Sequence, residues 1–209
     1  VVAFLEAIKG HHFETLYFVD LFTGMRQGEL LGLTWGSIDF KAGTILVSKQ
    51  LIKGNKHREM YYLDSLKNNK PRKIKPASIV MEKLKAHKRI QTEWKLRAGK
   101  AWDNPMDLVF TNELGGHLTH YTVYKYYKAI VSELGMPNLR FHDMRHSYAV
   151  ISLMNGDDIK TVQENLGHHT AAFTLDTYGH VTDSMRSESA NRMDTFIQSI
   201  QDEKVVNNN

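Results

Sequence analysis

Cysteine is absent from this 209-residue chain, and no apolar run is long enough to cross a membrane. Without cysteine the chain can form neither a disulfide framework nor a thiolate metal site. Its first residues do not resemble a signal peptide, so we expect a cytoplasmic protein. The composition, 42% hydrophobic and 24% charged, is ordinary for a globular domain with one substantial core.

Acidic residues are scarce in the middle of the chain. Residues 41–100 contain 17 lysines and arginines against four acidic side chains, whereas net charges of −3 and −6 fall on residues 1–40 and 101–209. Such a local excess is typical of a nucleic-acid-binding surface, because phosphates release condensed counterions when cationic side chains neutralise them. Much of it lies in residues 79–90, where lysines on the outer face of a helix would only solvate that helix. Composition alone leaves both interpretations open.

Hydrophobic periodicity predicts a mainly α protein with a small antiparallel β-sheet, an α+β fold. Helices are expected over residues 2–9, 12–23, 27–33, 77–97, 121–134, 140–154, 159–166 and 183–200. The β-rich stretches 44–52 and 72–76 would form the sheet, and 108–111 a short extended piece. One helix is rich in tyrosines that we expect to serve packing, namely Tyr121, Tyr124, Tyr126 and Tyr127.

Two segments place an arginine beside a polar partner. Arg26 begins a predicted helix in which Glu29, three residues later, lies on the same turn. This spacing is compatible with a buried, oriented arginine and with a weak surface ion pair. His142 and Arg145 likewise share one face of a later helix, where both can meet one phosphate. Asp143 is expected to orient the arginines or a neighbouring histidine.

The stretch from Leu166 to His180 contains the candidate nucleophile. His168 follows a glycine that would end a helix, and Tyr178 directly precedes another glycine. A free tyrosine has a pKa near ~10 and attacks poorly at neutral pH. Arginines and histidines would stabilise both its departing proton and the attacked group. The sequence therefore suggests that Tyr178 attacks a phosphate.

Six candidate site residues follow one another along the chain in the order Arg26, Lys67, His142, Arg145, His168 and Tyr178. This order resembles the catalytic domain of tyrosine recombinases, most closely the integrases of phages and conjugative transposons, over nearly the whole chain. The resemblance implies the fold of that domain. It also implies a site-specific DNA recombinase that cleaves and rejoins strands through a 3′-phosphotyrosine intermediate, for integration and excision of a mobile element or phage.

The resemblance assigns the covalent step to Tyr178 and the protonation of the leaving oxygen to a lysine. Lys67 fits best, because Lys67-x-x-Lys70-x-Arg72-x-Ile74 matches the family's pattern of a hairpin lysine followed by a basic residue and a strand-ending Ile or Val. Lys70 is the nearer competitor, and Lys53, in a segment of similar spacing, is the more distant one.

The remaining roles implied by the resemblance concern the phosphate. Arg26, Arg145 and His168 would bind it, and His142 would add a supporting hydrogen bond. Glu29 would orient Arg26 from behind. Because guanidinium stays charged and grips two oxygens in one plane, arginine suits this task better than lysine.

The resemblance further implies that neither a metal nor a cofactor is used. The expected partners are double-stranded DNA and further copies of the chain, from a dimer to a synaptic tetramer on DNA, without a membrane. Residues 1–182 would form the catalytic domain. Residues 183–209 would form a C-terminal helix and tail, docked on their own chain or exchanged with a neighbouring copy; the sequence leaves this open. We expect the N-terminal core-binding and arm-binding domains of the family to be absent.

Three other functions share parts of this pattern. A type IB topoisomerase uses similar tyrosine chemistry, but His142 stands where that class carries a lysine. A DNA-binding module without catalysis would keep the basic segment, although all six site positions are filled here. A metal-dependent hydrolase would build on His142 and His146, whose spacing suits zinc, but no convincing third ligand accompanies them.

Overall fold

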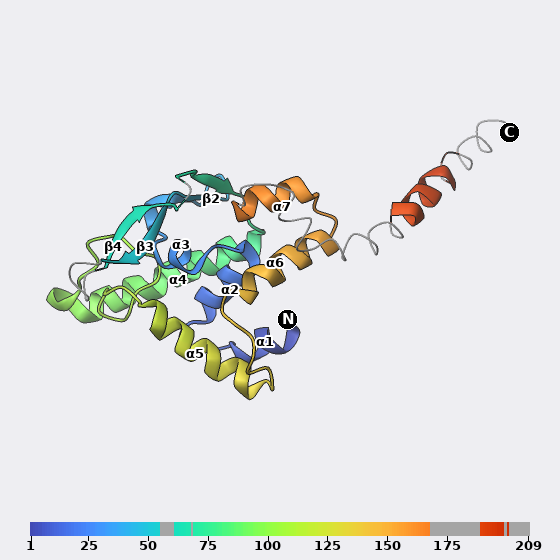
Figure 1. Cartoon of the computed structure of the whole chain (residues 1–209). Helices are drawn as coiled ribbons and strands as arrows, with labels where there is room; N and C mark the ends of the chain where they lie inside the picture. Colours follow the sequence, from blue (N-terminus) through green and yellow to red (C-terminus); the bar gives the residue numbers. More distant parts are fainter. Residues whose placement is uncertain (55–60, 68, 168–188, 199, 201–209) are drawn as a thin grey trace. The chain divides into compact units, whose positions relative to one another are not determined.

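Helices dominate this structure, a computed structural model that describes residues 1–54, 61–67, 69–167, 189–198 and 200. The α-helices are α1 (Val2–Ala7), α2 (Glu14–Thr23), α3 (Gln27–Leu31), α4 (Ser78–Ala98), α5 (His120–Glu133), α6 (Asp143–Met154) and α7 (Ile159–Leu166) (Figure 1). The short 3-10 helices are η1 (Trp35–Ser37) and η2 (Gly99–Ala101). The strands are β1 (Ile38–Asp39), β2 (Thr44–Val47), β3 (Lys49–Lys53), β4 (Tyr61–Ser65) and β5 (Arg72–Ile74).

The chain divides into two compact units. The first comprises Val1–Tyr148 and Asn165–Gly167, and it contains both sheets. The second comprises Ala149–Glu164 and the described residues after Gly167. Among the described helices, none combines the length and the apolar character that a bilayer crossing requires.

The core of the first unit includes α2. Apolar residues at helical spacing are buried on this helix, among them Leu16, Tyr17 and Val19. The Tyr17 hydroxyl donates to the Val123 carbonyl at 2.9 Å, which joins α2 to α5. Gly24 ends α2 in the left-handed conformation, with a φ of 59°. The chain therefore turns immediately into Arg26, the residue that begins α3.

Two small antiparallel sheets take the place of the single sheet that was predicted. One has the order β1-β2-β5 and the other consists of β3 and β4. The predicted strand over residues 44–52 divides at Ser48, because β2 pairs with β5 while β3 pairs with β4. The strand β4 was not predicted: most of its residues are exposed, so it lacks an apolar alternation. The predicted fold class, helices with small antiparallel sheets, is confirmed.

The register of the two sheets determines where Lys67 lies. Val47 pairs with Arg72 in one sheet, and Lys49 pairs with Ser65 in the other. Ser48 alone separates Val47 from Lys49, whereas residues 66–71 separate their partners Ser65 and Arg72. Lys67 lies in this connection between β4 and β5. The sequence pattern suggested instead that Lys67 lies in a hairpin. The tip of the β3–β4 hairpin falls in residues 55–60, outside the described residues.

The predicted helices are present, with ends shifted by a few residues. One shift affects the site: the helix predicted from residue 140 begins at Asp143. The Asp143 carboxylate accepts the backbone N–H of Arg140 at 2.8 Å and closes a turn ahead of the helix. His142 therefore lies just before α6 and not within it. Of the helix predicted over residues 183–200, residues 189–198 and 200 are described, and they are helical.

Two smaller predictions are partly wrong. The extended piece at 108–111 is reduced to isolated bridges at its two ends. The tyrosines of α5 divide between its faces: Tyr127 is buried, whereas Tyr121 is 72% exposed, and Tyr124 and Tyr126 are also exposed. Tyr127 lies four residues from Val123 and Val131 on the buried face, and the others lie elsewhere around the helix.

The contact between α3 and β3 is close because Gly32 lacks a side chain. A Cβ atom at Gly32 would lie 2.6 Å from the Leu51 nitrogen and 2.8 Å from the Gln50 carbonyl carbon. Both are backbone atoms, which cannot move aside without disturbing the strand. The helix that begins at Arg26 is thereby held against a sheet.

We expect Gly32→Ala to lower the free energy of unfolding by about 1–3 kcal/mol, because the added methyl overpacks this contact. Urea unfolding followed by circular dichroism measures the change. Gly36→Ala is the matched control, since a Cβ at Gly36 meets nothing within 4 Å. Equal stability of the two variants would contradict the close approach.

Candidate active site

Three arginines from different parts of the chain donate to three successive backbone carbonyls at the end of α7. Arg72 Nε donates to Asn165 O at 2.6 Å, and Arg145 Nη2 donates to Leu166 O at 2.7 Å. Arg26 Nη2 donates to the next carbonyl, Gly167, at 3.2 Å. The last carbonyls of a helix lack partners within it and carry the negative end of the helix dipole, so guanidinium groups are suitable partners.

Gly167 ends α7 as the sequence predicted. Its φ of 63° lies in the left-handed region, and a Cβ there would also lie 3.1 Å from Arg72 Nη1. The next residue, His168, lies outside the described residues, as does Tyr178. What the structure establishes is the position of the chain immediately before His168.

Arg26 and Glu29 form the contact predicted from their spacing. Arg26 Nη1 donates to Glu29 Oε1, and the Arg26 backbone N–H donates to Glu29 Oε2, both at 2.9 Å. The Arg26 side chain is 39% exposed, whereas Glu29 is 2% exposed. The pair is therefore not a weak surface ion pair: a buried carboxylate holds the arginine from behind.

Arg72 is a second partner of Glu29, and the sequence analysis did not assign it to the site. Its Nη1 and Nη2 donate to Glu29 Oε1 and Oε2 at 3.1 and 2.6 Å. Burial alone would raise the pKa of Glu29, but hydrogen bonds and charge from Arg72, together with Arg26, hold it below its ordinary value. A signal was present in the sequence: Arg72 lies two residues from the apolar Ile74, which puts both side chains on one face of β5.

Arg145 lines a small cavity of about 90 Å³ together with Asp20, Met25, Gln27, Phe141 and His142. It is 3% exposed, and its Nη1 donates to Gly24 O at 2.6 Å. The structure thus brings Arg145 and His142 to one hollow, as predicted from their spacing. Burial, His146 and the charge of Arg145 lower the pKa of His142, so its neutral form is favoured.

Asp20 is a buried carboxyl group in the wall of that cavity, and it is not among the site residues expected from the sequence. Asp20 is 1% exposed, and its Oδ1 has no hydrogen-bond partner among the described residues. Burial raises the pKa of Asp20 well above its ordinary value; Arg145 opposes this effect and Glu29 adds to it. Asp20 is therefore favoured as the neutral acid, which leaves the charge of Arg145 uncompensated by it.

Two predicted residues lie apart from the arginines. Lys67 is exposed, and no hydrogen bond or ion pair joins it to them within the described part of the chain. Asp143 was expected to orient the site arginines or a histidine, but its carboxylate accepts a hydrogen bond from Nη2 of Arg140, a largely exposed residue, at 2.9 Å. Across residues 1–54, 61–67 and 69–167 and the short described helix beyond, no cluster of metal ligands is found.

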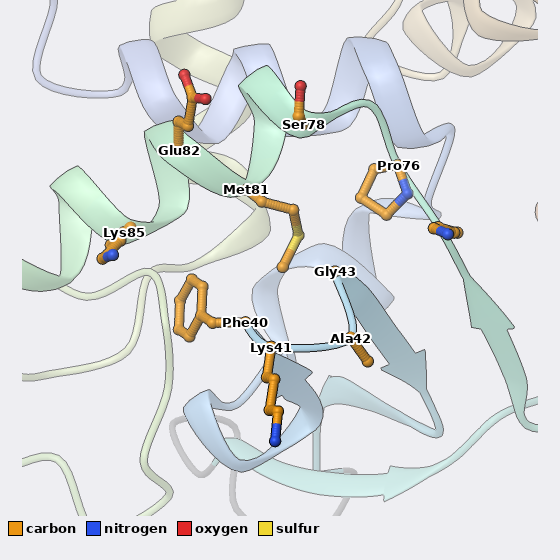
Figure 2. A pocket seen from close by; sticks show the side chains of 10 residues that line it. Phe40, Lys41, Ala42, Gly43, Pro76, Ser78, Met81, Glu82 and Lys85 are labelled. Atoms are coloured by element: carbon orange, nitrogen blue, oxygen red, sulfur yellow. The ribbon is translucent and has the colours of Figure 1, made fainter.

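A larger hollow of about 400 Å³ lies between the β1–β2 turn and the start of α4 (Figure 2). Lys41, Lys75 and Lys85 line it, together with Phe40 and Met81. None of the predicted site residues is among its lining residues. The strand register places Lys75 beyond Ile74 and Ile45, at the opposite end of the β2–β5 pair from Arg72. The hollow is therefore separate from the arginine cluster.

Comparison with known proteins gives consistent results. The family model described as the phage integrase family matches residues 3–185. A "Tyrosine recombinase XerC-like" protein of Caldanaerobacter subterraneus is 36% identical over 203 residues, covering 92% of this chain and 52% of that protein. The ICEBs1 integrase of Bacillus subtilis is 28% identical, with 88% and 49% covered. The chain thus spans about half the length of these curated relatives.

Solved structures share the fold. The Tn1549 transposon integrase in complex with transposon right end DNA gives a TM-score of 0.73 at 24% identity, covering 90% of this chain and 62% of that one. The XerA recombinase gives a TM-score of 0.68 at 20% identity, covering 90% and 61%. At these identities the likeness concerns the arrangement of helices and strands, which agrees with the predicted fold.

The raised pKa of Asp20 predicts how stability depends on pH. A carboxyl that binds its proton more tightly when folded stabilises the fold fully below about pH 4, the pKa of an unfolded aspartate, and this contribution is lost as the pH rises towards the folded-state pKa. Asparagine cannot ionise. We therefore expect the stability of Asp20→Asn, relative to the unsubstituted chain, to rise between pH 4 and pH 8.

Urea unfolding at a series of pH values measures this difference. Asp103→Asn, at an exposed aspartate, is the control and should show little change with pH. A stability difference for Asp20→Asn that stays flat from pH 4 to pH 8 would rule out a raised pKa.

Proposed function

The chain belongs to the phage integrase family, and on that basis we propose that it is the catalytic domain of a site-specific DNA recombinase. It would cleave and rejoin DNA strands through a covalent 3′-phosphotyrosine intermediate, for integration and excision of a mobile element or phage. The proposal draws on relatives named as recombinases and integrases, and on similar folds solved in complex with DNA.

The observation that carries the proposal is the convergence of Arg26 and Arg145 on the carbonyls that directly precede His168. Arg26 is separated from Gly167 by 141 positions in the sequence, and Arg145 from Leu166 by 21. A phosphodiester under attack gathers negative charge on its nonbridging oxygens. Fixed guanidinium groups suit this charge, because they remain cationic and donate several hydrogen bonds in one plane.

Arg26 has donors left for such a phosphate. Of the five N–H groups of a guanidinium, the Arg26 side chain uses one for Glu29 and one for Gly167 within the described residues. It is also 39% exposed. The remaining donors can therefore reach a group in solution while the Glu29 carboxylate fixes the plane of the guanidinium.

The proposed reaction transfers a phosphate of the DNA backbone from a 5′ oxygen to the phenolic oxygen of Tyr178. The Tyr178 phenolic oxygen forms a bond to phosphorus as the bond to the 5′ oxygen breaks, and Lys67 would give that oxygen a proton. The phenolic proton of Tyr178 would pass to His142 or His168, and the other histidine would hydrogen-bond the phosphate. The ester keeps the energy of the broken bond, so a 5′-hydroxyl can later reverse the step without ATP.

We also propose the partners and the organisation that go with this chemistry. Double-stranded DNA would be the substrate, bound by a dimer to tetramer of chains in the cytoplasm. Residues 1–182 would form the catalytic domain, and residues 183–209 a helix and tail that docks on its own or a neighbouring copy. In support, the described part of this segment exposes large apolar side chains, namely Met193, Phe196, Ile197 and Ile200.

We expect the chain to form a covalent adduct with DNA. The substrate is a pool of DNA duplexes with one nick and randomised sequence around it. Cleavage near the nick releases a short fragment that dissociates, so the strand cannot be rejoined and the adduct accumulates. EDTA is present throughout. Tyr178→Phe should form no adduct, because it lacks the attacking oxygen, whereas Tyr121→Phe, at a tyrosine 72% exposed, should match the unsubstituted chain. An adduct from Tyr178→Phe would refute the assignment of the nucleophile.

We further expect Arg26→Lys to slow adduct formation by about 100-fold, the scale seen when one donor to a developing oxyanion is lost. Lysine keeps the charge but cannot contact Glu29, Gly167 and a phosphate in one plane. Single-turnover rates on saturating DNA measure the effect. Arg97→Lys, at an exposed arginine near the end of α4, is the control. Equal rates for the two variants would show that Arg26 does not bind the phosphate.

A further inference from the structure

Glu29 shares its charge between two arginines. Arg26 and Arg72 both donate to its two oxygens, at 2.6–3.1 Å. The Arg72 side chain is 9% exposed and that of Glu29 is 2% exposed, so this inner pair is largely removed from solvent. If Glu29 paired with Arg26 alone, their charges would cancel. With Arg72 present, the three groups together carry one net positive charge.

We propose that Arg72 is a positioning residue for the recombination reaction, which acts through Glu29 on Arg26 and through Asn165 on the turn before His168. This inference rests on the proposed function. Arg72 would keep the buried carboxylate occupied, so that Arg26 presents its charge and its free N–H groups to the DNA phosphate.

Each of the three guanidinium nitrogens of Arg72 donates one hydrogen bond. Nη1 and Nη2 bind the two carboxylate oxygens side by side, and Nε binds Asn165 O at 2.6 Å. This fork-shaped arrangement is specific to guanidinium, because a lysine ammonium cannot hold two oxygens in a plane and a third acceptor beside them. One side chain therefore fixes both the carboxylate behind Arg26 and the end of α7.

The base of Arg72 is itself fixed. Arg72 pairs with Val47 in the β2–β5 ladder, and Ile74, two residues on, is buried. A side chain that extends from a paired strand is a firmer support than one on a loop. Through its contacts with Glu29 and Asn165, Arg72 thus connects the arginine site to the β1-β2-β5 sheet of the same compact unit.

Charge and position make separable predictions. If the charge of Arg72 is removed, Glu29 is left with Arg26 as its single cationic partner. In a site with little water this pair attracts more strongly than in solution. Arg26 would then be drawn towards Glu29 and away from the phosphate. Removing both buried charges, in Arg72→Gln with Glu29→Gln, would leave Arg26 cationic and uncompensated. A role in folding alone predicts instead that the rate follows the free energy of unfolding from variant to variant, because removing both partners of a buried ion pair also relieves the instability caused by removing one.

The experiment measures single-turnover adduct formation on saturating nicked duplexes, with DNA affinity and urea unfolding measured in parallel. Arg72→Gln should slow the reaction on the order of 10- to 100-fold, the scale of a small misplacement of a reacting group, with a smaller change in DNA affinity. The double variant with Glu29→Gln should be several-fold faster than Arg72→Gln. Lys9→Gln, at an exposed lysine outside the basic segment of residues 41–100, should match the unsubstituted chain.

Arg72→Lys is the third variant. It keeps the positive charge but loses the paired N–H groups that bind both oxygens of Glu29. It should fold and still slow the reaction, and it replaces Arg72→Gln as the deciding variant if the latter is unfolded. An unchanged rate in the folded Arg72 variants, or a double variant no faster than Arg72→Gln, would overturn the proposal. Absence of adduct from both the unsubstituted chain and Lys9→Gln would instead contradict the proposed recombinase function.

Discussion

The hydrogen bonds at the carboxyl end of α7 are the interaction on which the site depends. Three guanidinium groups reach three successive carbonyls there, from the start of α3, from β5 and from α6. A helix end offers acceptors that its own backbone cannot satisfy, and their dipoles favour cations. The same contacts that complete the helix therefore gather the positive charges, and they do so directly before His168.

Concentrated positive charge requires that nearby carboxyl groups do not cancel it. In the part of the chain that the structure describes, two buried carboxyl groups lie beside the arginines, and their charge states differ. Glu29 is kept ionised by two arginines, so one positive charge remains over. Asp20 lies near Arg145 without a partner for its Oδ1 among the described residues, and burial favours its neutral form. Both arrangements leave the site available to an anion.

The sequence predicted the parts of the site that follow from local spacing. The pair Arg26 and Glu29 share a turn, and Gly167 ends a helix, because such relations involve neighbours along the chain. Arg72 and Asp20 were missed because their partners are distant in sequence. Strand register also escaped prediction, since the exposed residues of β4 carry no apolar alternation. His168 and Tyr178 lie outside the described residues, so their roles stay predictions.

The offset between the two sheets has a consequence for how such a chain can diversify. The ladder that holds Arg72 against Val47 closes independently of the hairpin formed by β3 and β4, because the register changes at Ser48. The number of residues between Lys53 and Tyr61 can therefore change without altering the pairing that supports the arginines. Variation at that position can alter what the chain recognises while the arginine contacts stay constant.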